Sequence, residues 1–233
     1  GTVEGARGPQ FDGRLRLDDE LQGNIHQVTN EVYNLFLEHG YSKQRIYYLA
    51  TNTSLDADGN GYDDDVDLKS SHDNLKKALT QWATDASLGL GPERALTLYM
   101  MDHGGVDRFY LDGSSQTVTP DELDRWIDEV ETAAPGVRVN LIMDACHAGS
   151  FMDALGQDQD KRVVIASTAT HAVAYATQKG ARFSDTFVEA LRRGLSLYNS
   201  FEEARWTAET AYPDQTPWLD RSEEHTSDSS HYS

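Results

Sequence analysis

Three short apolar runs constrain the fold of this chain more than any other feature. They cover residues 95–101 (ALTLYMM), 137–143 (VRVNLIM) and 162–166 (RVVIA). Apolar runs of this length without alternation are typical of parallel strands that are buried on both faces. A sheet made of such strands needs helices on both sides to cover it.

Helical patterns separate these runs. Apolar residues recur at helical spacing over 18–39, and Gly40 follows as a stop signal. A second helix is predicted to begin at Ser71, and a third at Thr119, where Pro120 suits the first helical position. Further helices are predicted at 184–193 and 200–211, with strands at 45–50 (RIYYLA) and 108–111. The alternation predicts an α/β fold, a three-layer sandwich in which helices flank a mostly parallel sheet.

The 233 residues suffice for one full hydrophobic core, and no linker rich in Pro or Gly interrupts them. We therefore predict one domain over residues 1–220. A sheet of this kind normally opens with a strand, yet no strand-like run precedes the helix at 18–39, so we expect a fragment that lacks its first strand. Residues 221–233 (RSEEHTSDSSHYS) contain no aliphatic side chain and are predicted to be disordered. This tail is similar to a translated sequencing adapter with one slip of frame, so we expect a fragment truncated at both ends.

The net charge of −19 argues against a nucleic acid or an anionic membrane surface as the partner. No apolar run approaches the roughly 18 residues that a membrane span requires. The single cysteine, Cys146, excludes an internal disulfide framework and a zinc site built from several cysteines. The negative charge permits cationic partners, including metal ions, and the oligomeric state is left open.

The segment 56–67 (DADGNGYDDDVD) contains six Asp residues and no basic residue. Its spacing matches a calcium loop, which takes oxygen ligands from positions 1, 3, 5, 7, 9 and 12 and a Gly at position 6. The predicted calcium ligands are Asp56, Asp58, Asn60, the Tyr62 carbonyl, Asp64 and Asp67, with Gly61 at the turn. Position 12 is Asp instead of the usual Glu, as in dockerin-type loops, which this segment resembles. The other interpretation is a solvated acidic turn.

Two of the predicted strands lead into reactive residues. The first is followed by Asp102-His103-Gly104-Gly105, and the second by Asp144-Ala145-Cys146. In an open α/β sheet the site lies beyond the carboxyl ends of the strands, so His103 and Cys146 meet there if the strands are neighbours. A thiol becomes a strong nucleophile when a base such as His activates it, and glycine N–H groups can stabilise an oxyanion. A lone buried Cys beside an unrelated His is the alternative.

The segments LYMMDHGG and LIMDACHAGSF resemble the two signature blocks of the caspase–hemoglobinase superfamily of cysteine peptidases. The order after the cysteine is closer to legumains (asparaginyl endopeptidases) and their bacterial relatives, and the resemblance covers about residues 20–220. It implies a caspase-like fold, Cys146 as the nucleophile and His103 as the general acid/base. It also implies an oxyanion hole made by the N–H groups of Gly104 and Cys146. The family's primary pocket maps onto Ser167 and Thr168.

These observations predict a calcium-stabilised cysteine endopeptidase that hydrolyses peptide bonds through a thioester, with Asn or Asp as candidate residues before the cleaved bond. His147 and His171 are weaker candidates for the base. Two other interpretations remain open: a catalytically silent caspase-like module that binds a partner, and a metal site of His103, Cys146 and His147. A weak calcium loop suits an extracellular or periplasmic location.

Overall fold

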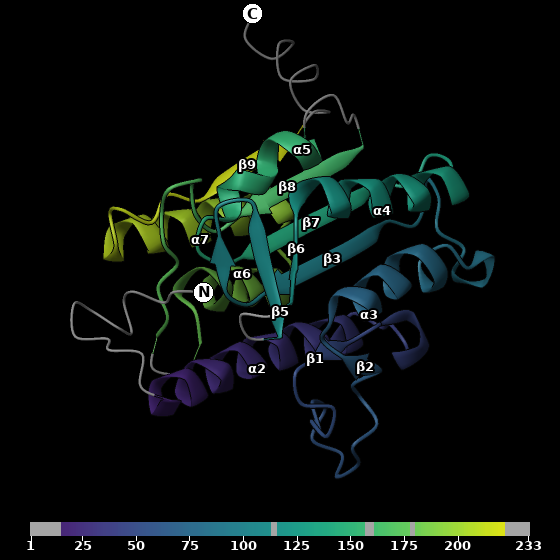
Figure 1. The fold of residues 1–233 in the computed structure, drawn as a ribbon, viewed down its shortest axis with the longest axis horizontal. Coiled ribbons are helices and arrows are strands. Elements are labelled where there is room, and N and C mark those ends of the chain that lie inside the picture. The colour runs from purple at the N-terminus through teal and green to yellow at the C-terminus, as the bar shows by residue number, and fades with distance from the viewer. Residues whose placement is uncertain (1–14, 113–115, 157–160, 178–179, 222–233) are drawn as a thin grey trace, which may run out of the picture.

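The main sheet contains the three strands that the apolar runs predict. The computed structural model describes residues 15–112, 116–156, 161–177 and 180–221. Strands β3 (Leu96–Met101), β7 (Val139–Asp144) and β8 (Arg162–Ala166) are parallel, and β9 (Trp218–Arg221) pairs with β8 in the antiparallel direction. The strand order is β3-β7-β8-β9 (Figure 1). The sequence did not indicate β9, and the predicted disorder of the tail falls almost wholly outside the described residues.

Helices cover both faces of this sheet, which confirms the predicted three-layer sandwich. The longer helices are α2 (Leu15–Glu38), α4 (Pro120–Ala133), α6 (Arg182–Arg192) and α7 (Leu197–Ala211). Shorter ones are α3 (His72–Lys77), which continues as a π-helical segment at Ala78–Trp82, and α5 (Met152–Gly156). Single 3-10 turns lie at Lys43–Arg45, Ala86–Leu88 and Ala148–Phe151.

Successive residues of β7 point into different layers. Leu141 and Met143 pack in the cluster that holds α3, α4 and α5, whereas Ile142 packs against α6 and α7. This alternation follows from the two-residue period of a strand. Helix α2 packs against α6, where Val32 contacts Val188. None of the described helices is long and apolar enough to span a bilayer.

Helix α4 begins at Pro120 with Thr119 as its N-cap, which confirms the predicted start of this helix. The Thr119 hydroxyl accepts a hydrogen bond from the Glu122 N–H, and the Glu122 carboxylate accepts one from the Thr119 N–H at 3.0 Å. This reciprocal capping satisfies two backbone donors that a helix start otherwise leaves free.

Two predictions about strands need correction. The run 45–50 forms a strand only at Leu49–Ala50 (β1), which pairs with β2 (Leu68–Lys69) in a separate two-stranded sheet. Strand β3 is not fully buried, since Leu98 and Tyr99 are partly exposed. The reason is that β3 pairs only with β7 among the described residues, so that its other edge is open.

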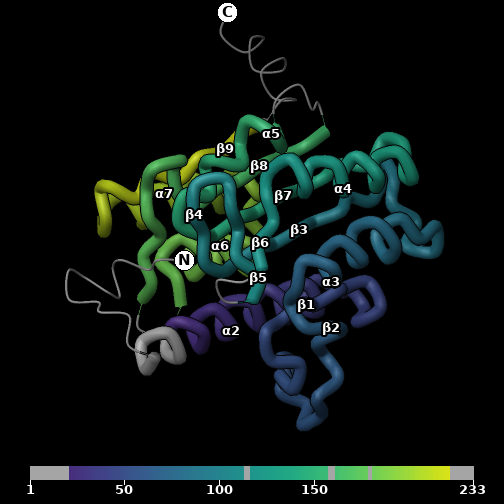
Figure 2. The backbone as a smooth tube through the Cα atoms, in the orientation of Figure 1, coloured from purple at the N-terminus to yellow at the C-terminus, as the bar shows by residue number. Residues whose placement is uncertain are grey.

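A second small sheet follows β3 directly. It consists of β4 (Gly104–Gly105), β5 (Arg108–Asp112) and β6 (Gln116–Val118), all antiparallel. The tube in Figure 2 shows this sheet in front of the main sheet. Strand β5 confirms the predicted strand at 108–111, and β4 places His103 in the short link between the two sheets.

Candidate active site

His103 and Cys146 leave neighbouring strands at the same edge of the main sheet. Strands β3 and β7 pair in parallel, and the last pair in their register is Met101 with Asp144. His103 and Cys146 each follow two residues later. The sequence-based condition for a common site, that the two strands are neighbours, is therefore met.

The glycine after His103 lies directly against Cys146. A β-carbon on Gly104 would lie 2.0 Å from the Cys146 carbonyl oxygen and 3.0 Å from the Ala145 side chain. The distance to the carbonyl oxygen is too short for any residue with a side chain unless the backbone moves. Gly104 therefore allows the two strand ends to meet, and its role in the oxyanion hole stays a prediction.

Thr168 holds the turn that carries the cysteine. Its hydroxyl donates to the Ala145 carbonyl at 3.0 Å and accepts from the Ala148 N–H at 3.1 Å. Its carbonyl accepts a further bond from the Gly149 N–H at 2.9 Å. Ser167 and Thr168 are both fully buried. Their predicted place beside a substrate pocket stays a prediction, while Thr168 contacts the backbone on both sides of Cys146.

The Cys146 thiol is covered by a segment that the sequence did not single out. Cys146 is 1% exposed, and the N–H of Ala174 donates to its sulfur at 3.3 Å. The N–H of His147 donates to the Ala172 carbonyl at 2.8 Å, which ties this segment to the cysteine turn. A ligand can reach the sulfur only after groups that cover it, Ala174 among them, have moved.

The imidazole of His147 is turned toward another partner. His147 has a positive φ of 59°, and its Nδ1 lies 2.9 Å from the Thr170 carbonyl oxygen. These contacts position the loop after β8. They support the interpretation that His147 is a weaker candidate for the catalytic base than His103.

The carboxyl groups of Asp102, which is partly buried, and Asp144, which is buried, lie beside Cys146. Burial raises the pKa of Asp102 to about 7, and burial also raises the pKa of Asp144. The Ser184 hydroxyl donates to the Asp144 carboxylate, and the Tyr99 hydroxyl donates to Ser184 at 2.5 Å. Asp102, Asp144 and Cys146 line one cavity of about 20 Å³, counted as space open to the centres of water molecules. That volume is sufficient for about one water molecule.

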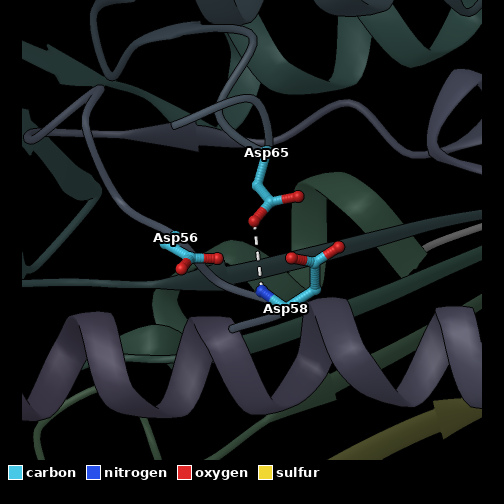
Figure 3. A group of neighbouring side chains, drawn as sticks. All are labelled: Asp56, Asp58 and Asp65. Atoms are coloured by element: carbon cyan, nitrogen blue, oxygen red, sulfur yellow. Dashed lines mark hydrogen bonds between the residues drawn. The ribbon is translucent and has the colours of Figure 1, made fainter. Parts of the chain in front are cut away.

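The acidic loop brings together only part of the predicted calcium ligand set. Asp56 and Asp58 approach Asp65, so that one carboxylate oxygen from each lies within 4.8 Å of the others (Figure 3). Asp65 was not among the predicted ligands. It is nearly buried and accepts hydrogen bonds from the N–H groups of Ala57 at 2.7 Å and Asp58 at 3.1 Å. Asp67 instead accepts from the N–H of Tyr48 at 2.8 Å.

The turn within the loop follows the predicted pattern. Asp56 accepts from the N–H groups of Asn60 at 2.9 Å and Gly61 at 2.8 Å, and Gly61 has a φ of 90°. The N–H of Tyr62 donates to the Asn60 side-chain oxygen at 2.8 Å.

A lysine neutralises one side of the acidic cluster. The Lys43 ammonium lies 3.0 Å from Asp58, 2.7 Å from Asp64 and 2.7 Å from Asp65. The carboxylate oxygens are donors of the type that calcium binds. The donor chemistry therefore fits calcium, although Lys43 competes with a metal ion for the same negative charge.

Comparison with known proteins assigns the family. A family model described as the Peptidase C13 family matches residues 74–210, which is more than half of the chain and includes both His103 and Cys146. The chain belongs to the Peptidase C13 family. This C13 member is 28% identical to Metacaspase-1A of Neurospora crassa over 152 residues, which cover 60% of this chain and 30% of that protein. It is also 28% identical to Metacaspase-1 of Eremothecium gossypii over 147 residues, 58% of this chain and 29% of that protein.

The fold of this C13 member is caspase-like. Caspase-1 from Spodoptera frugiperda matches with a TM-score of 0.57 and 12% identity, over 86% of this chain and 79% of that chain. The chain spans about 30% of the length of the curated metacaspases it matches. These relationships support the predicted membership of the caspase–hemoglobinase superfamily.

Proposed function

We propose that this domain is a cysteine endopeptidase with Cys146 as the nucleophile and His103 as the general acid/base. The observation that carries the proposal is the meeting of two strand ends, where Gly104 lies against the Cys146 backbone. The comparisons support a cysteine peptidase in general, and the assignment of roles to these residues is our own.

The reaction divides peptide hydrolysis into two steps. His103 accepts the thiol proton, and the sulfur of Cys146 attacks the carbonyl carbon of the substrate. The N–H groups of Gly104 and Cys146 stabilise the negative oxygen that develops. The C–N bond then breaks as His103 protonates the departing amine. Water attacks the thioester, which releases the acid and restores the thiol.

The carboxyl groups of Asp102 and Asp144 favour Asn over Asp as the substrate residue before the cleaved bond, once the segment that covers Cys146 has moved. Asp102 and Asp144 lie beside Cys146, and burial raises the pKa of both. A protonated carboxyl group can donate as well as accept hydrogen bonds, which matches a carboxamide. A substrate carboxylate would meet two groups that become negative. A cationic substrate residue is the competing possibility, because ionised carboxylates would attract it.

A peptide library tests the proposal. The full chain is incubated with peptides that carry Asn, Asp, Arg or Lys before the cleaved bond, and cleavage is followed by mass spectrometry. We expect cleavage after Asn, loss of cleavage in Cys146→Ala, and strong reduction in His103→Ala. His147→Ala is the matched control and should retain activity. A folded wild-type chain that neither cleaves the library nor reacts at Cys146 with a peptidyl electrophile would favour the silent binding module.

We also propose that the acidic loop binds calcium, with carboxylate oxygens of Asp56, Asp58 and Asp65 as ligands. Calcium would then stabilise the turn at Gly61, and Lys43 would be displaced toward solvent. Such a site suits millimolar calcium, which is consistent with the proposed extracellular or periplasmic location.

Thermal unfolding in calcium and in a chelator tests this site. We expect calcium to raise Tm by several degrees, because a ligand that binds only the folded state stabilises it. Asp58→Asn should reduce the shift, whereas Asp63→Asn, an exposed acid of the same loop outside the cluster, should not. Equal Tm values with calcium and chelator would exclude a calcium site.

A further inference from the structure

Residues 172–177 (AVAYAT), here called the cover segment, lie across Cys146 outside the strands of the main sheet. The segment is held at both ends. At its start, the Ala172 carbonyl accepts a hydrogen bond from the His147 N–H at 2.8 Å. At its end, the Thr177 carbonyl accepts one from the Asn24 side chain of α2 at 3.1 Å. The residues between these two points can therefore move as a loop while the main sheet stays in place.

The contact between the cover segment and the thiol is weak by itself. The Ala174 N–H donates to the Cys146 sulfur at 3.3 Å, and sulfur is a poor hydrogen-bond acceptor. Ala174, Tyr175 and Ala176 line the same small cavity as Cys146, and that cysteine is 1% exposed. A closed position of this kind requires stronger contacts elsewhere along the segment.

Gln215 supplies such a contact. Its side chain is fully buried shortly before β9. The side-chain oxygen accepts from the Tyr175 N–H at 3.3 Å, and the side-chain nitrogen donates to the Ser167 carbonyl at 3.1 Å. Because Ser167 directly follows β8, one carboxamide joins the cover segment to the main sheet. Opening would separate the buried Gln215 oxygen from the Tyr175 N–H, and a buried acceptor without a partner is unfavourable.

An aromatic stack holds the same residue of the cover segment. The ring of Tyr175 lies parallel to that of Tyr212, with centroids 4.0 Å apart and an angle of 2° between the planes. The Tyr175 hydroxyl donates to the Asp214 carboxylate at 2.5 Å. The Gln215 N–H donates to the Tyr212 carbonyl at 2.9 Å, so the stack and the carboxamide belong to one turn after α7. This turn, residues 212–215, contacts Tyr175 through its backbone N–H, its ring and its hydroxyl.

We propose that Gln215 is a positioning residue that holds the cover segment closed over Cys146, with the Tyr175–Tyr212 stack as the second part of the same latch. When the latch opens, Ala174 and Tyr175 move outward and the sulfur becomes accessible. The turn at 212–215 thereby controls access to a thiol on another element, as a lid controls an active site. The inference rests on the proposed function in taking Cys146 as the reactive group, but it concerns access to the sulfur and not hydrolysis.

Alkylation of the full chain by iodoacetamide tests the latch, because Cys146 is the only cysteine in the sequence. Gln215→Met keeps the approximate length of the side chain and removes both hydrogen bonds. Tyr212→Leu removes the stack, whereas Tyr212→Phe keeps it and is the matched control. Amide hydrogen exchange is followed in the same proteins at Ala174, in the cover segment, and at Ile142, in β7.

We expect alkylation to be at least about tenfold faster in Gln215→Met and in Tyr212→Leu than in the wild type. Tyr212→Phe should react like the wild type. Exchange at Ala174 should accelerate by a similar factor, while exchange at Ile142, which is paired on both sides, should stay unchanged. This difference separates local opening from global unfolding. Alkylation at the wild-type rate in the folded Gln215→Met and Tyr212→Leu variants would overturn the proposal.

Gln215→Glu adds a readout that a space-filling role would not produce. A protonated carboxyl group can donate to the Ser167 carbonyl and accept from the Tyr175 N–H, as the carboxamide does, whereas a carboxylate cannot donate. We expect its alkylation rate to be close to that of the wild type at low pH and to exceed it as the carboxyl ionises. The other titratable groups of the site are common to both proteins, so the ratio of rates isolates position 215. A raised ratio that is the same at every pH would overturn the assignment of Gln215.

The latch and the peptidase can fail separately in these experiments. A chain whose latch variants open as expected, but which cleaves no peptide, would refute the proposed peptidase and keep the latch. A chain that cleaves peptides, but whose folded latch variants are alkylated at the wild-type rate, would refute the latch alone.

Discussion

The backbone of Gly104 lies so close to Cys146 that a β-carbon on the glycine would be 2.0 Å from the cysteine carbonyl oxygen. This contact joins the end of β3 to the end of β7 and places His103 next to the turn that carries the thiol. It requires a residue without a side chain at position 104.

Replacing this glycine should therefore damage the site. We expect Gly104→Ala to reduce kcat/KM by about a hundredfold, because a displacement of the order of 1 Å in a reacting group has an effect of this size. Overpacking should also lower the free energy of unfolding by about 1–3 kcal/mol. Gly105→Ala is the matched control, since its β-carbon would lie an ordinary 3.6 Å from the Tyr110 hydroxyl. Kinetics and urea unfolding measure both effects, and equal loss in the two variants would contradict the prediction.

The hydroxyl of Thr168 gives a second test of how the cysteine turn is held. Thr168→Val keeps the shape of the side chain but removes its hydrogen bonds to Ala145 and Ala148. The Ala145 carbonyl and the Ala148 N–H then keep only the longer hydrogen bond between them, at 3.4 Å, and we expect the free energy of unfolding to fall by about 1–3 kcal/mol. The rate of Cys146 labelling by a peptidyl electrophile should fall as well. Thr168→Ser keeps the hydroxyl and should restore labelling; a Ser variant as poor as the Val variant would mean that shape, and not hydrogen bonding, matters here.

Arg162 is a buried cation that joins β8 to α4. It is 2% exposed and contacts Asp124 at 2.5 Å, Asp128 at 2.7 Å and Glu131 at 2.8 Å. We expect Arg162→Ala to lower the free energy of unfolding by about 3–5 kcal/mol, because the carboxylates lose their partner and a cavity forms.

The matched control is Arg192→Ala. Arg192 also contacts three carboxylates, but its side chain is 31% exposed. Its loss should change the free energy of unfolding by at most about 1 kcal/mol. Chemical denaturation compares the two variants, and similar losses would show that burial does not decide the effect.

The raised pKa of Asp102 predicts a dependence of stability on pH. The folded protein holds this proton up to a pKa of about 7, whereas the unfolded chain releases it near the ordinary value of 3.8. Between these values the folded state binds more protons, so the free energy of unfolding falls as the pH rises. We expect the contribution to be present at pH 4 and lost above about pH 7, with a size on the order of a few kcal/mol.

Asp102→Asn should remove this part of the pH dependence. Urea unfolding at several pH values from 4 to 8 measures it, and Asp153→Asn, an exposed acid of α5, serves as the control. An Asn variant with the same pH profile as the wild type would show that Asp102 does not carry the effect.

The apolar runs predicted β3, β7 and β8 because a strand buried between helical layers needs a continuous apolar stretch. The same logic failed at β9, where the short segment Trp218–Arg221 lacks such a stretch and pairs with β8 only through tertiary contacts. The prediction of a strand over all of 45–50 was also wrong. A strand needs a hydrogen-bonded partner strand, and among the described residues β2 pairs only with Leu49–Ala50.

For the site, local chemistry predicted roles for His103, Gly104 and Cys146, because a reactive residue beside glycine at a strand end is visible in sequence. The cover by Ala174, the bonds of Thr168 and the position of Lys43 among the acids join residues far apart in the chain. No periodicity or motif reports such contacts.

The sequence by itself determined the α/β class, the catalytic candidates and the turn of the acidic loop, because these follow from apolar periodicity and from short-range spacing. Only the tertiary structure decided that β3 and β7 are neighbours, that the thiol is covered, and that an apolar cleft separates β1 from β3. Each of these depends on which backbone edges and side chains meet across long stretches of chain. That outcome is set by the packing of the whole molecule.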